Sequence, residues 1–361
     1  MADEIYYKLA KVLDTLPNGF PATESGIEIK ILKWIFTPEQ ANLFCDMRLT
    51  FETAGQVAER TGRPLDGLEK QLKAMGRAGQ LFAIDFGGVR IYKMLPWVFG
   101  IYEFQLGRMD KEFAELCEEY GPIYRKQFFS ETPPLMRTVP IEKEISAGQE
   151  VLPYERVSNI IEQNQSFLVN DCICKKEKAL LGHPCDRPVA VCLAVAPVPG
   201  VFDKYPTGKA ITKQEAHDLM KKAEEWGLVH LTSNVQGGGF YICNCCKCCC
   251  GVLDAINQLG IPASLVINSN YYAQIDPEKC IQCGKCIDDR CQVKAIEKGD
   301  DASRVVRERC IGCGLCVMTC PGEAIRLARK ERDQITAPPV NEDTWFEQRG
   351  LMRGIDFSRY K

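Results

Sequence analysis

The distribution of cysteine constrains this chain more than any other feature of its sequence. Of the 20 cysteines among 361 residues, all except Cys45 and Cys117 lie in the segment from Cys172 to Cys320. In a reducing compartment thiols stay unpaired and available, so such a density favours metal ligation over a framework of disulfides. We therefore expect a metal-binding protein of a reducing, oxygen-poor cytoplasm.

Composition and charge exclude several other classes of protein. The chain is 45% hydrophobic and 26% charged, and its formal net charge of -3 provides no general attraction to nucleic acid or anionic membranes. The N-terminus, MADEIYYKLAKVLD, lacks the basic start and apolar run of a secretion signal. The uncharged apolar stretch MLPWVFGIY (94–102) is too short for a transmembrane helix. These features predict a cytoplasmic protein without a membrane span.

Two similar cysteine motifs follow one another near the C-terminus. The second, CIGCGLCVMTCPGEAI from Cys310, is a complete C-x2-C-x2-C-x3-C-P run. Its spacing lets a tight loop hold three corners of a [4Fe-4S] cubane, while the fourth cysteine points away and ligates a second cluster. The first motif, CIQCGKCIDDRCQVKAI from Cys280, follows nearly the same pattern. Structural zinc needs four ligands and would not explain the interleaved third cysteine of each run.

On these motifs, residues 276–327 resemble the bacterial two-[4Fe-4S] ferredoxin family. The first motif departs from the family, because four residues separate Cys286 from Cys291 and Gln292 stands where proline is expected. A bulge in the loop can absorb one extra residue, so we expect a changed solvent exposure or potential at that cluster and not its loss. The resemblance implies two [4Fe-4S] clusters, one held by Cys280, Cys283, Cys286 and Cys320 and the other by Cys310, Cys313, Cys316 and Cys291.

A second group of thiols lies between about residues 165 and 275, in an otherwise ordinary α/β pattern. Between its two halves, Thr212 and Glu215 form a capping box, Gly227 ends the helix, and the strand-like LVHLT follows. We therefore expect the thiols on loops at the ends of regular elements, where they meet in space. They are Cys172, Cys174, Cys185 and Cys192 in the first half, and Cys243, Cys245, Cys246, Cys248, Cys249 and Cys250 in the second.

These ten cysteines are predicted to bind metal, and the sequence leaves the kind of centre open. Four thiols per cubane allow two clusters with two thiols spare. Adjacent cysteines direct their side chains differently, so neighbouring thiols are expected to serve different clusters or a single non-cubane cluster. One or two further iron–sulfur clusters are the favoured interpretation. A copper–thiolate or zinc–thiolate centre and a redox-active dithiol or disulfide pair are the alternatives.

Two wider resemblances concern the same segment. Its adjacent cysteines resemble the CCG domains of heterodisulfide reductases, which bind non-cubane clusters, but the long spacings of those domains are absent. The whole chain is similar to a group of 4Fe-4S dicluster proteins from anaerobes with a CCxCCC motif. His183 is a candidate replacement for a thiolate, although a plain loop histidine is favoured. The run Gly237–Gly239 predicts a hairpin turn, and the sequence carries no nucleotide or flavin fingerprint.

The N-terminal part predicts short helices followed by a hairpin. Thr37-Pro38 with Gln40 marks a helix start, and LFAIDFGGVRIYKML alternates around two glycines as a two-residue hairpin does. Together these segments resemble a winged helix. DNA binding is one hypothesis, but acidic side chains share the same elements, and a docking or dimer-forming role is favoured. The basic side chains are Lys70, Lys73, Arg77, Arg90 and Lys93, the acidic ones are Asp66, Glu69 and Asp85, and Gln71 is the best candidate for reading bases.

The predicted fold class is α+β and multidomain, with a winged helix, a central cysteine-rich α/β domain and a C-terminal two-cluster ferredoxin fold. Cys45 and Cys117 are interpreted as buried hydrophobic residues. The tail shows no clear periodicity, and its aromatic side chains are expected to dock on a neighbouring surface. The expected segments are an N-terminal helix (1–26), the winged helix (27–100), a helical and extended connector (101–164), the cysteine-rich domain (165–275), the ferredoxin domain (276–330) and the tail (331–361).

The sequence as a whole favours an iron–sulfur electron-transfer protein. We expect a subunit or partner of a larger anaerobic oxidoreductase complex more than a stand-alone enzyme, because the thiols are the one chemical constellation that stands out. Electrons would pass singly through the ferredoxin clusters to the centre or centres of the middle segment. Expected partners are redox proteins and, through the winged helix, a second copy of the chain. The alternatives are a redox-responsive winged-helix transcription regulator and a reductase whose non-cubane cluster acts on a thiol or disulfide substrate.

Overall fold

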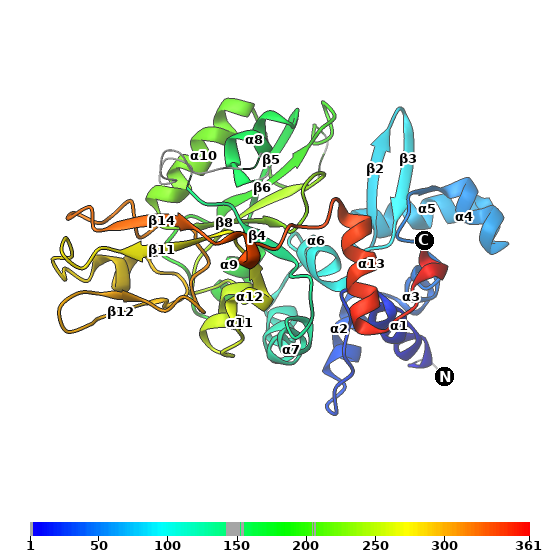
Figure 1. The fold of residues 1–361 in the computed structure, drawn as a ribbon. Coiled ribbons are helices and arrows are strands. Elements are labelled where there is room, and N and C mark those ends of the chain that lie inside the picture. The colour runs from blue at the N-terminus through cyan, green and yellow to red at the C-terminus, as the bar shows by residue number, and fades with distance from the viewer. Residues whose placement is uncertain (1–2, 142–151, 153–154, 204, 206) are drawn as a thin grey trace. The chain divides into compact units, whose positions relative to one another are not determined.

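A computed structural model describes residues 3–141, 152, 155–203, 205 and 207–361. Over these residues the chain is a mixed α/β protein with helices and several sheets (Figure 1). It divides into two compact units. The first consists of Met1–Phe128, Lys176–Pro184 and Phe346–Lys361, and the second of Phe129–Lys175 and Cys185–Trp345.

The first unit combines helices with a small antiparallel sheet. Its elements are α1 (Glu4–Thr15), α2 (Ile27–Ile35), α3 (Pro38–Phe44), β1 (Glu52–Thr53), α4 (Ala54–Thr61), α5 (Leu65–Arg77), β2 (Phe82–Phe86), β3 (Val89–Lys93), η1 (Trp97–Ile101), α6 (Tyr102–Phe104) and α7 (Lys111–Phe128). Thr37 and Gln40 form the predicted capping box of α3. The sheet has the order β1-β3-β2, and Gly87 and Gly88, both with positive φ, make the predicted two-residue turn between β2 and β3.

The C-terminal tail contains a helix that the sequence did not predict. It comprises η5 (Arg332–Gln334), α13 (Glu342–Arg353) and η6 (Ser358–Tyr360). The backbone N–H of Leu49 donates to the Tyr360 carbonyl at 2.6 Å, and the Trp345 indole donates to the Pro134 carbonyl at 2.9 Å. The aromatic side chains therefore pack on surfaces of the chain itself. Those buried are Trp345, Phe346, Phe357 and Tyr360.

A seven-stranded sheet organises the second unit, with the order β10-β4-β8-β9-β6-β5-β7. Its strands are β4 (Met136–Thr138), β5 (Ser166–Asp171), β6 (Ala190–Ala196), β7 (Lys209–Ile211), β8 (Val229–Ser233), β9 (Tyr241–Cys245) and β10 (Ile267–Asn268). Neighbours are antiparallel except for β10 and β4. The sheet takes β4 from the segment predicted to be a connector, because extended backbone pairs readily with a strand edge. Part of that connector lies outside the described residues.

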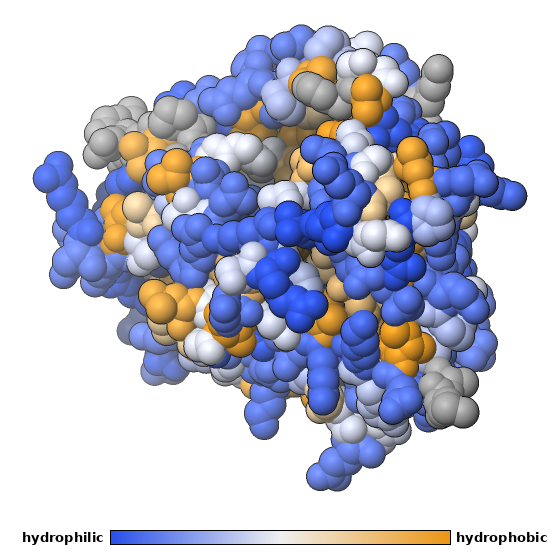
Figure 2. Space-filling model, turned by 90° about the vertical axis from the view of Figure 1, so that its right-hand side faces the viewer, coloured by the Kyte–Doolittle hydropathy of each residue, from blue (hydrophilic) through white to orange (hydrophobic). Residues whose placement is uncertain are grey.

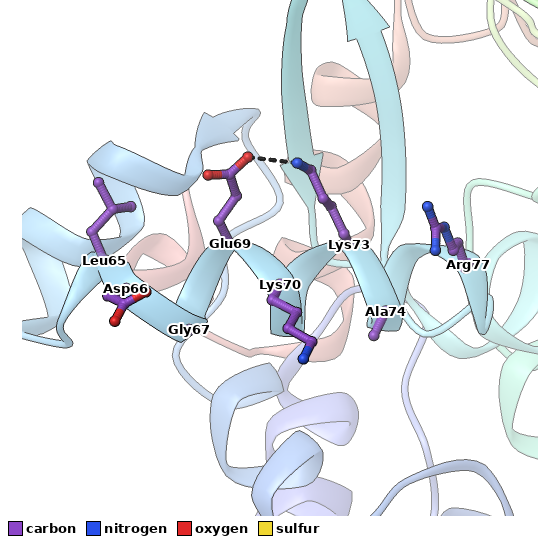
Figure 3. Close-up of a pocket in the computed structure, with 8 residues that line it drawn as sticks. All are labelled: Leu65, Asp66, Gly67, Glu69, Lys70, Lys73, Ala74 and Arg77. Carbon is purple, nitrogen blue, oxygen red and sulfur yellow. Dashed lines mark ion pairs between the residues drawn. The ribbon is translucent and has the colours of Figure 1, made fainter.

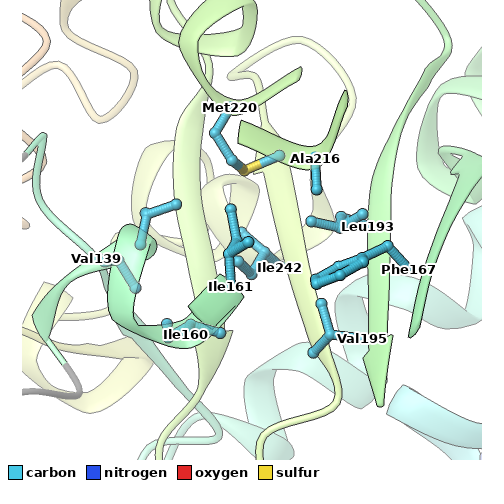
Figure 4. Packing of buried hydrophobic residues seen from close by; sticks show 10 residues of the cluster. Val139, Ile160, Ile161, Phe167, Leu193, Val195, Ala216, Met220 and Ile242 are labelled. Atoms are coloured by element: carbon cyan, nitrogen blue, oxygen red, sulfur yellow. The ribbon is translucent and has the colours of Figure 1, made fainter. Parts of the chain in front are cut away.

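Among the described residues, five helices lie between these strands in the sequence. They are α8 (Val157–Glu162), α9 (Ile173–Leu180), α10 (Lys213–Glu225), α11 (Gly251–Asn257) and α12 (Ala263–Val266). The predicted capping box of Thr212 and Glu215 starts α10, and Gly227 follows its end with positive φ. Apolar side chains of α8 and α10 meet the sheet in one core (Figure 4). That core consists of Val139, Val157, Ile160, Ile161, Phe167, Leu193, Val195, Ala216, Met220 and Ile242.

The segment that carries the two C-terminal cysteine motifs, residues 271–329, is called the ferredoxin segment below. It is built from two short antiparallel pairs of strands. They are β11 (Tyr271–Ile275) with β14 (Ile325–Arg329), and β12 (Ile296–Glu297) with β13 (Arg304–Val305). Buried Glu155 ties β11 to β14, because its carboxylate pairs with Arg329 at 3.0 Å and accepts from the Tyr271 hydroxyl at 3.2 Å. No helix of the described residues has both the length and the apolar character needed to cross a membrane.

Candidate iron–sulfur and thiolate centres

The eight cysteines of the ferredoxin segment gather in two interleaved sets. The thiols close enough to act electrostatically on Cys286 are those of Cys283, Cys320 and Cys280. Those acting on Cys316 include the thiols of Cys313, Cys310 and Cys291. The fourth cysteine of each motif thus lies beside the first three of the other motif, which is the grouping that a pair of clusters requires.

The surroundings of these sulfurs suit cluster ligands. Backbone N–H groups donate to sulfur from Ala295 to Cys291 at 3.0 Å, from Ala324 to Cys320 at 3.2 Å and from Ala273 to Cys310 at 3.4 Å. Such donors stabilise the negative charge on iron-bound sulfur. Burial raises the pKa of Cys313 to about 12, so a thiolate there needs the positive charge of a metal.

Close backbone contact also fits a loop wrapped around a cluster. Gly312 has a φ of 60°, and a Cβ added there would lie 2.3 Å from the carbonyl oxygen of Tyr271. No other residue fits this position, because a side chain would collide with a backbone atom of β11. The second motif therefore needs glycine between its first two cysteines.

The first motif accommodates its extra residue in a single π turn. The backbone N–H of Cys291 donates to the carbonyl of Cys286 at 3.1 Å, and this i to i+5 bond closes η4 (Cys286–Arg290). The predicted bulge is therefore present in this form. It turns Gln292, which replaces the usual proline, into the protein interior, where 1% of its surface is exposed.

Gln292 connects the ferredoxin segment to the central thiols. Its Oε1 accepts a hydrogen bond from the backbone N–H of Lys247 at 2.9 Å, and the Lys247 ammonium donates to the Asp288 carbonyl at 3.0 Å. Lys247 stands between Cys246 and Cys248, so two hydrogen bonds fix the central cysteine run against the π turn. The cysteine motifs alone do not predict this contact, although glutamine in place of proline at position 292 is the sequence signal for it.

The ten central cysteines separate into two groups. The first, which we call the compact thiol group, brings together a loop between α9 and β6 and the turn after β9. Its sulfur atoms all lie within 4.8 Å of one another. It consists of Cys185, Cys246, Cys248 and Cys249.

Sulfur–sulfur distances in the compact thiol group are short and similar. Cys248 lies 3.3 Å from Cys246, 3.5 Å from Cys185 and 3.6 Å from Cys249, and Cys185 lies 3.8 Å from Cys246. Interactions with Cys246 and Cys249, and to a smaller extent with the Arg187 guanidinium, lower the pKa of Cys248 to about 2. An anionic sulfur is thus favoured at the exposed member of the group.

The second group, the extended thiol group, is arranged by the sheet. Leu193 of β6 pairs with Ile242 of β9, which puts the cysteines next to them on adjacent strands. Each thiol interacts with the next along a continuous row. In that order the row is Cys174, Cys172, Cys192, Cys243, Cys245 and Cys250.

A buried cation accompanies the extended thiol group. Lys175 is 1% exposed, its ammonium donates to the Pro188 carbonyl at 2.6 Å, and its positive charge acts on Cys172. Interactions with Cys174 and Cys192 are the main causes that lower the pKa of Cys172. A buried ammonium is costly unless a negative charge lies near it, and a thiolate-bound cluster would supply that charge.

The remaining candidates lie outside both groups. His183 is exposed and does not belong to the compact thiol group, His230 is buried with its Nδ1 2.6 Å from Asn244 Oδ1, and His217 pairs with Glu162 at 3.0 Å. Cys45 and Cys117 are buried. Their burial raises both pKa values, to about 11 for Cys45, as expected of hydrophobic cysteines.

Comparison with known proteins identifies one part of the chain. Residues 273–327 match the family model of the 4Fe-4S dicluster domain. The match includes both cysteine motifs and the strands β11 and β14. The match supports iron–sulfur binding and electron transfer by this part of the chain. No curated protein and no solved structure was found to match the chain.

Proposed function

We propose that this protein is a cytoplasmic electron-transfer protein that serves as a subunit or partner of an anaerobic oxidoreductase complex. The observation that carries the proposal is the contact of Lys247 with Gln292 and the Asp288 carbonyl, which joins the ferredoxin segment to the central thiols. A pair of clusters supplies one-electron chemistry. A fixed contact between two thiol-rich loops suits a protein that relays electrons.

In this proposal the ferredoxin segment holds two [4Fe-4S] clusters. Cys280, Cys283, Cys286 and Cys320 ligate one, and Cys310, Cys313, Cys316 and Cys291 ligate the other. The backbone N–H groups that donate to three of these sulfurs orient the ligands and moderate their charge.

The central segment holds at least one further cluster in the proposal. The extended thiol group is suited to it because three of its six thiols, those of Cys172, Cys245 and Cys250, are buried, the other three are half-buried, and Lys175 offers a compensating charge. Burial also favours electron relay over a reductase reaction, since a thiol or disulfide substrate has to reach the metal. Electron transfer tolerates a buried centre.

For the N-terminal segment we propose a winged helix that docks a partner and does not read DNA. Two of the five basic side chains named on α5 and the hairpin form ion pairs with acidic neighbours. Lys73 meets Glu69 at 2.7 Å and Arg90 meets Asp85 at 2.6 Å, as Figure 3 shows for the pair on α5. Fewer free cations remain to neutralise phosphates, so binding to DNA would be weak.

The partner surface is expected to be polar. On the face of the molecule drawn in Figure 2, hydrophilic side chains predominate and apolar ones form small separate groups. Small polar interfaces are typical of transient complexes between redox proteins. We therefore expect redox partners that bind and dissociate, with a second copy of the chain as a further candidate.

The test is a redox titration of the full chain, grown and purified without air. About eight irons with sulfide are expected from the C-terminal clusters, and more if the central segment also binds iron. Electrons delivered to the C-terminal clusters should then appear in a central centre with its own paramagnetic signal. Colourless protein without iron and inorganic sulfide would refute the proposal, and salt-sensitive binding to promoter DNA would favour the regulator instead.

A further inference from the structure

We propose that the compact thiol group, formed by Cys185, Cys246, Cys248 and Cys249, binds a single Zn²⁺ ion and is not part of an iron–sulfur cluster. The inference deepens the proposed function, because it separates the ten central cysteines into a zinc site of four and an electron-carrying site of six.

The distances fit one ion at the centre of a tetrahedron. A zinc ion binds thiolate sulfur at about 2.3 Å, which puts any two of four tetrahedral ligands about 3.8 Å apart. The four measured sulfur–sulfur distances run from 3.3 to 3.8 Å, and the other pairs are below 4.8 Å. The space between the sulfurs therefore suits one metal ion and is too small for a cubane of four irons and four sulfides.

The ferredoxin segment of the same structure provides the comparison. Across the described residues, no other three side chains of Cys, His, Asp or Glu bring their ligand atoms as close together as the compact thiol group does. The thiols of the 4Fe-4S dicluster domain are therefore spaced more widely. The extended thiol group is also spread out in this way, so it resembles the cluster-binding sulfurs and the compact thiol group does not.

The four ligands come from two short segments of the chain, as is common in structural zinc sites. Three come from one turn, closed by a hydrogen bond from the Cys250 N–H to the Cys246 carbonyl at 3.1 Å. The fourth, Cys185, comes from a separate loop. A closed set of four sulfurs without a site for water is typical of structural zinc and not of catalytic zinc.

A zinc ion here would hold the electron-transfer junction in place. Lys247 lies between two of the ligands, and its backbone N–H and ammonium contact Gln292 and the Asp288 carbonyl. Fixing Cys246 and Cys248 on one ion fixes Lys247 as well. The ion would thus set the position of the ferredoxin segment relative to the extended thiol group without carrying electrons, since Zn²⁺ has no redox chemistry.

Metal analysis of three variants tests the assignment. The full chain is produced without air in medium that supplies both iron and zinc, and both metals are counted per chain. We expect one zinc in the wild type. Cys185→Ser should lower zinc to about a tenth or less and leave iron unchanged, and Cys248→Ser should do the same. The matched control, Cys243→Ser in the extended thiol group, should lower iron and leave zinc unchanged.

X-ray absorption at the zinc edge of the wild type tests the site without any variant that could misfold. Four sulfur ligands at about 2.3 Å are expected. Oxygen or nitrogen ligands, a wild type without zinc, or loss of iron from Cys185→Ser would each overturn the inference. The iron count of the C-terminal clusters is read from the same samples, so a failure of the electron-transfer proposal would be seen as missing iron while zinc stays bound.

Discussion

The ferredoxin segment and the central thiol segment hold cysteines in two different ways. In the first, each thiol set takes three members from one continuous motif and one from its repeat. In the second, each set draws on separate strands, loops and helix ends, and two pairs of cysteines adjacent in sequence, Cys245–Cys246 and Cys249–Cys250, are divided between the sets. Sequence spacing alone defines the first arrangement, whereas the second exists only once the sheet has formed.

Cysteine density therefore does not by itself identify the metal or cluster that a thiol binds. Cys245 and Cys246 are neighbours in the chain, yet Cys245 points into the row of the extended thiol group and Cys246 into the compact thiol group. Cys245 is the last residue of β9 and lies on the same face of the strand as Cys243, whereas Cys246 begins the turn that follows the strand. Four experiments test this distinction between the two segments.

Removal of one ferredoxin ligand should have the largest effect. Cys316→Ala is expected to remove about four irons per chain and one of the two C-terminal paramagnetic signals, since a cubane needs four thiolates. Zinc content should not change. Iron and zinc analysis with paramagnetic resonance provides the measurement, and Cys117→Ala is the control because this cysteine is a buried hydrophobic residue. Unchanged iron in Cys316→Ala would contradict the ligand assignment.

Loss of Glu155 should destabilise the ferredoxin strands strongly. Glu155→Ala leaves the Arg329 guanidinium without its carboxylate in a buried site, which costs about 3–5 kcal/mol of unfolding free energy. Glu297→Ala is the matched control, because its pair with Arg304 is exposed and is worth about 1 kcal/mol or less. Chemical denaturation measures both. Equal effects of the two substitutions would show that the buried pair does not hold β11 and β14 together.

The dependence of stability on pH should report on Glu177 in α9, the helix that also contains Cys174. Burial raises the pKa of Glu177 on α9 to about 7, and the hydrogen bond from the Tyr102 hydroxyl at 2.5 Å opposes the shift. Since the unfolded chain loses this proton near pH 4.5, stability should fall as pH rises from about 4.5 to 7 and then level off, by at most about 3 kcal/mol.

Glu177→Gln is the variant that isolates this effect. It carries no ionisable proton, so the fall in stability between pH 4.5 and 7 should shrink by the contribution of that carboxyl group. Thermal unfolding at several pH values gives the comparison. Described acidic side chains of residues 276–330 are exposed or half-buried, so the ferredoxin segment should not contribute a similar fall. The same slope in variant and wild type would show that Glu177 titrates elsewhere.

The smallest change in stability is expected at the junction. Gln292→Pro restores the ferredoxin pattern and removes the acceptor of the Lys247 N–H, at a cost of about 1 kcal/mol. Metal content should stay the same, but reduction of the central centre after rapid reduction of the C-terminal clusters should become slower. Gln292→Ala removes the same acceptor while keeping the backbone N–H of residue 292, and so separates the lost hydrogen bond from the effect of proline. Equal rates in all three proteins would remove the junction from the electron path.

Much of the ferredoxin segment was predictable from sequence, because its motif spacing specifies the loop and the bulge at Cys286. The capping boxes of α3 and α10 and the β2–β3 hairpin were predictable for a similar reason, since each depends on a few adjacent residues. The helix α13 was missed because its apolar and polar residues do not follow a clear period. The division of the central thiols was not predictable, because it depends on the pairing of β6 with β9.

The order of the two thiol groups along residues 243–250, two members of the extended group, three of the compact group and one of the extended group, has a consequence for how this segment can change. Substitution of Asn244 or Lys247 leaves each sulfur facing its own group. Deletion or insertion of a single residue within β9 reverses the direction of the strand side chains beyond it, and one in the turn moves every later sulfur by one place, so sulfurs would be presented to the wrong group. Natural variation in this run should therefore consist of replacements at constant length, while the loops on either side accept gaps.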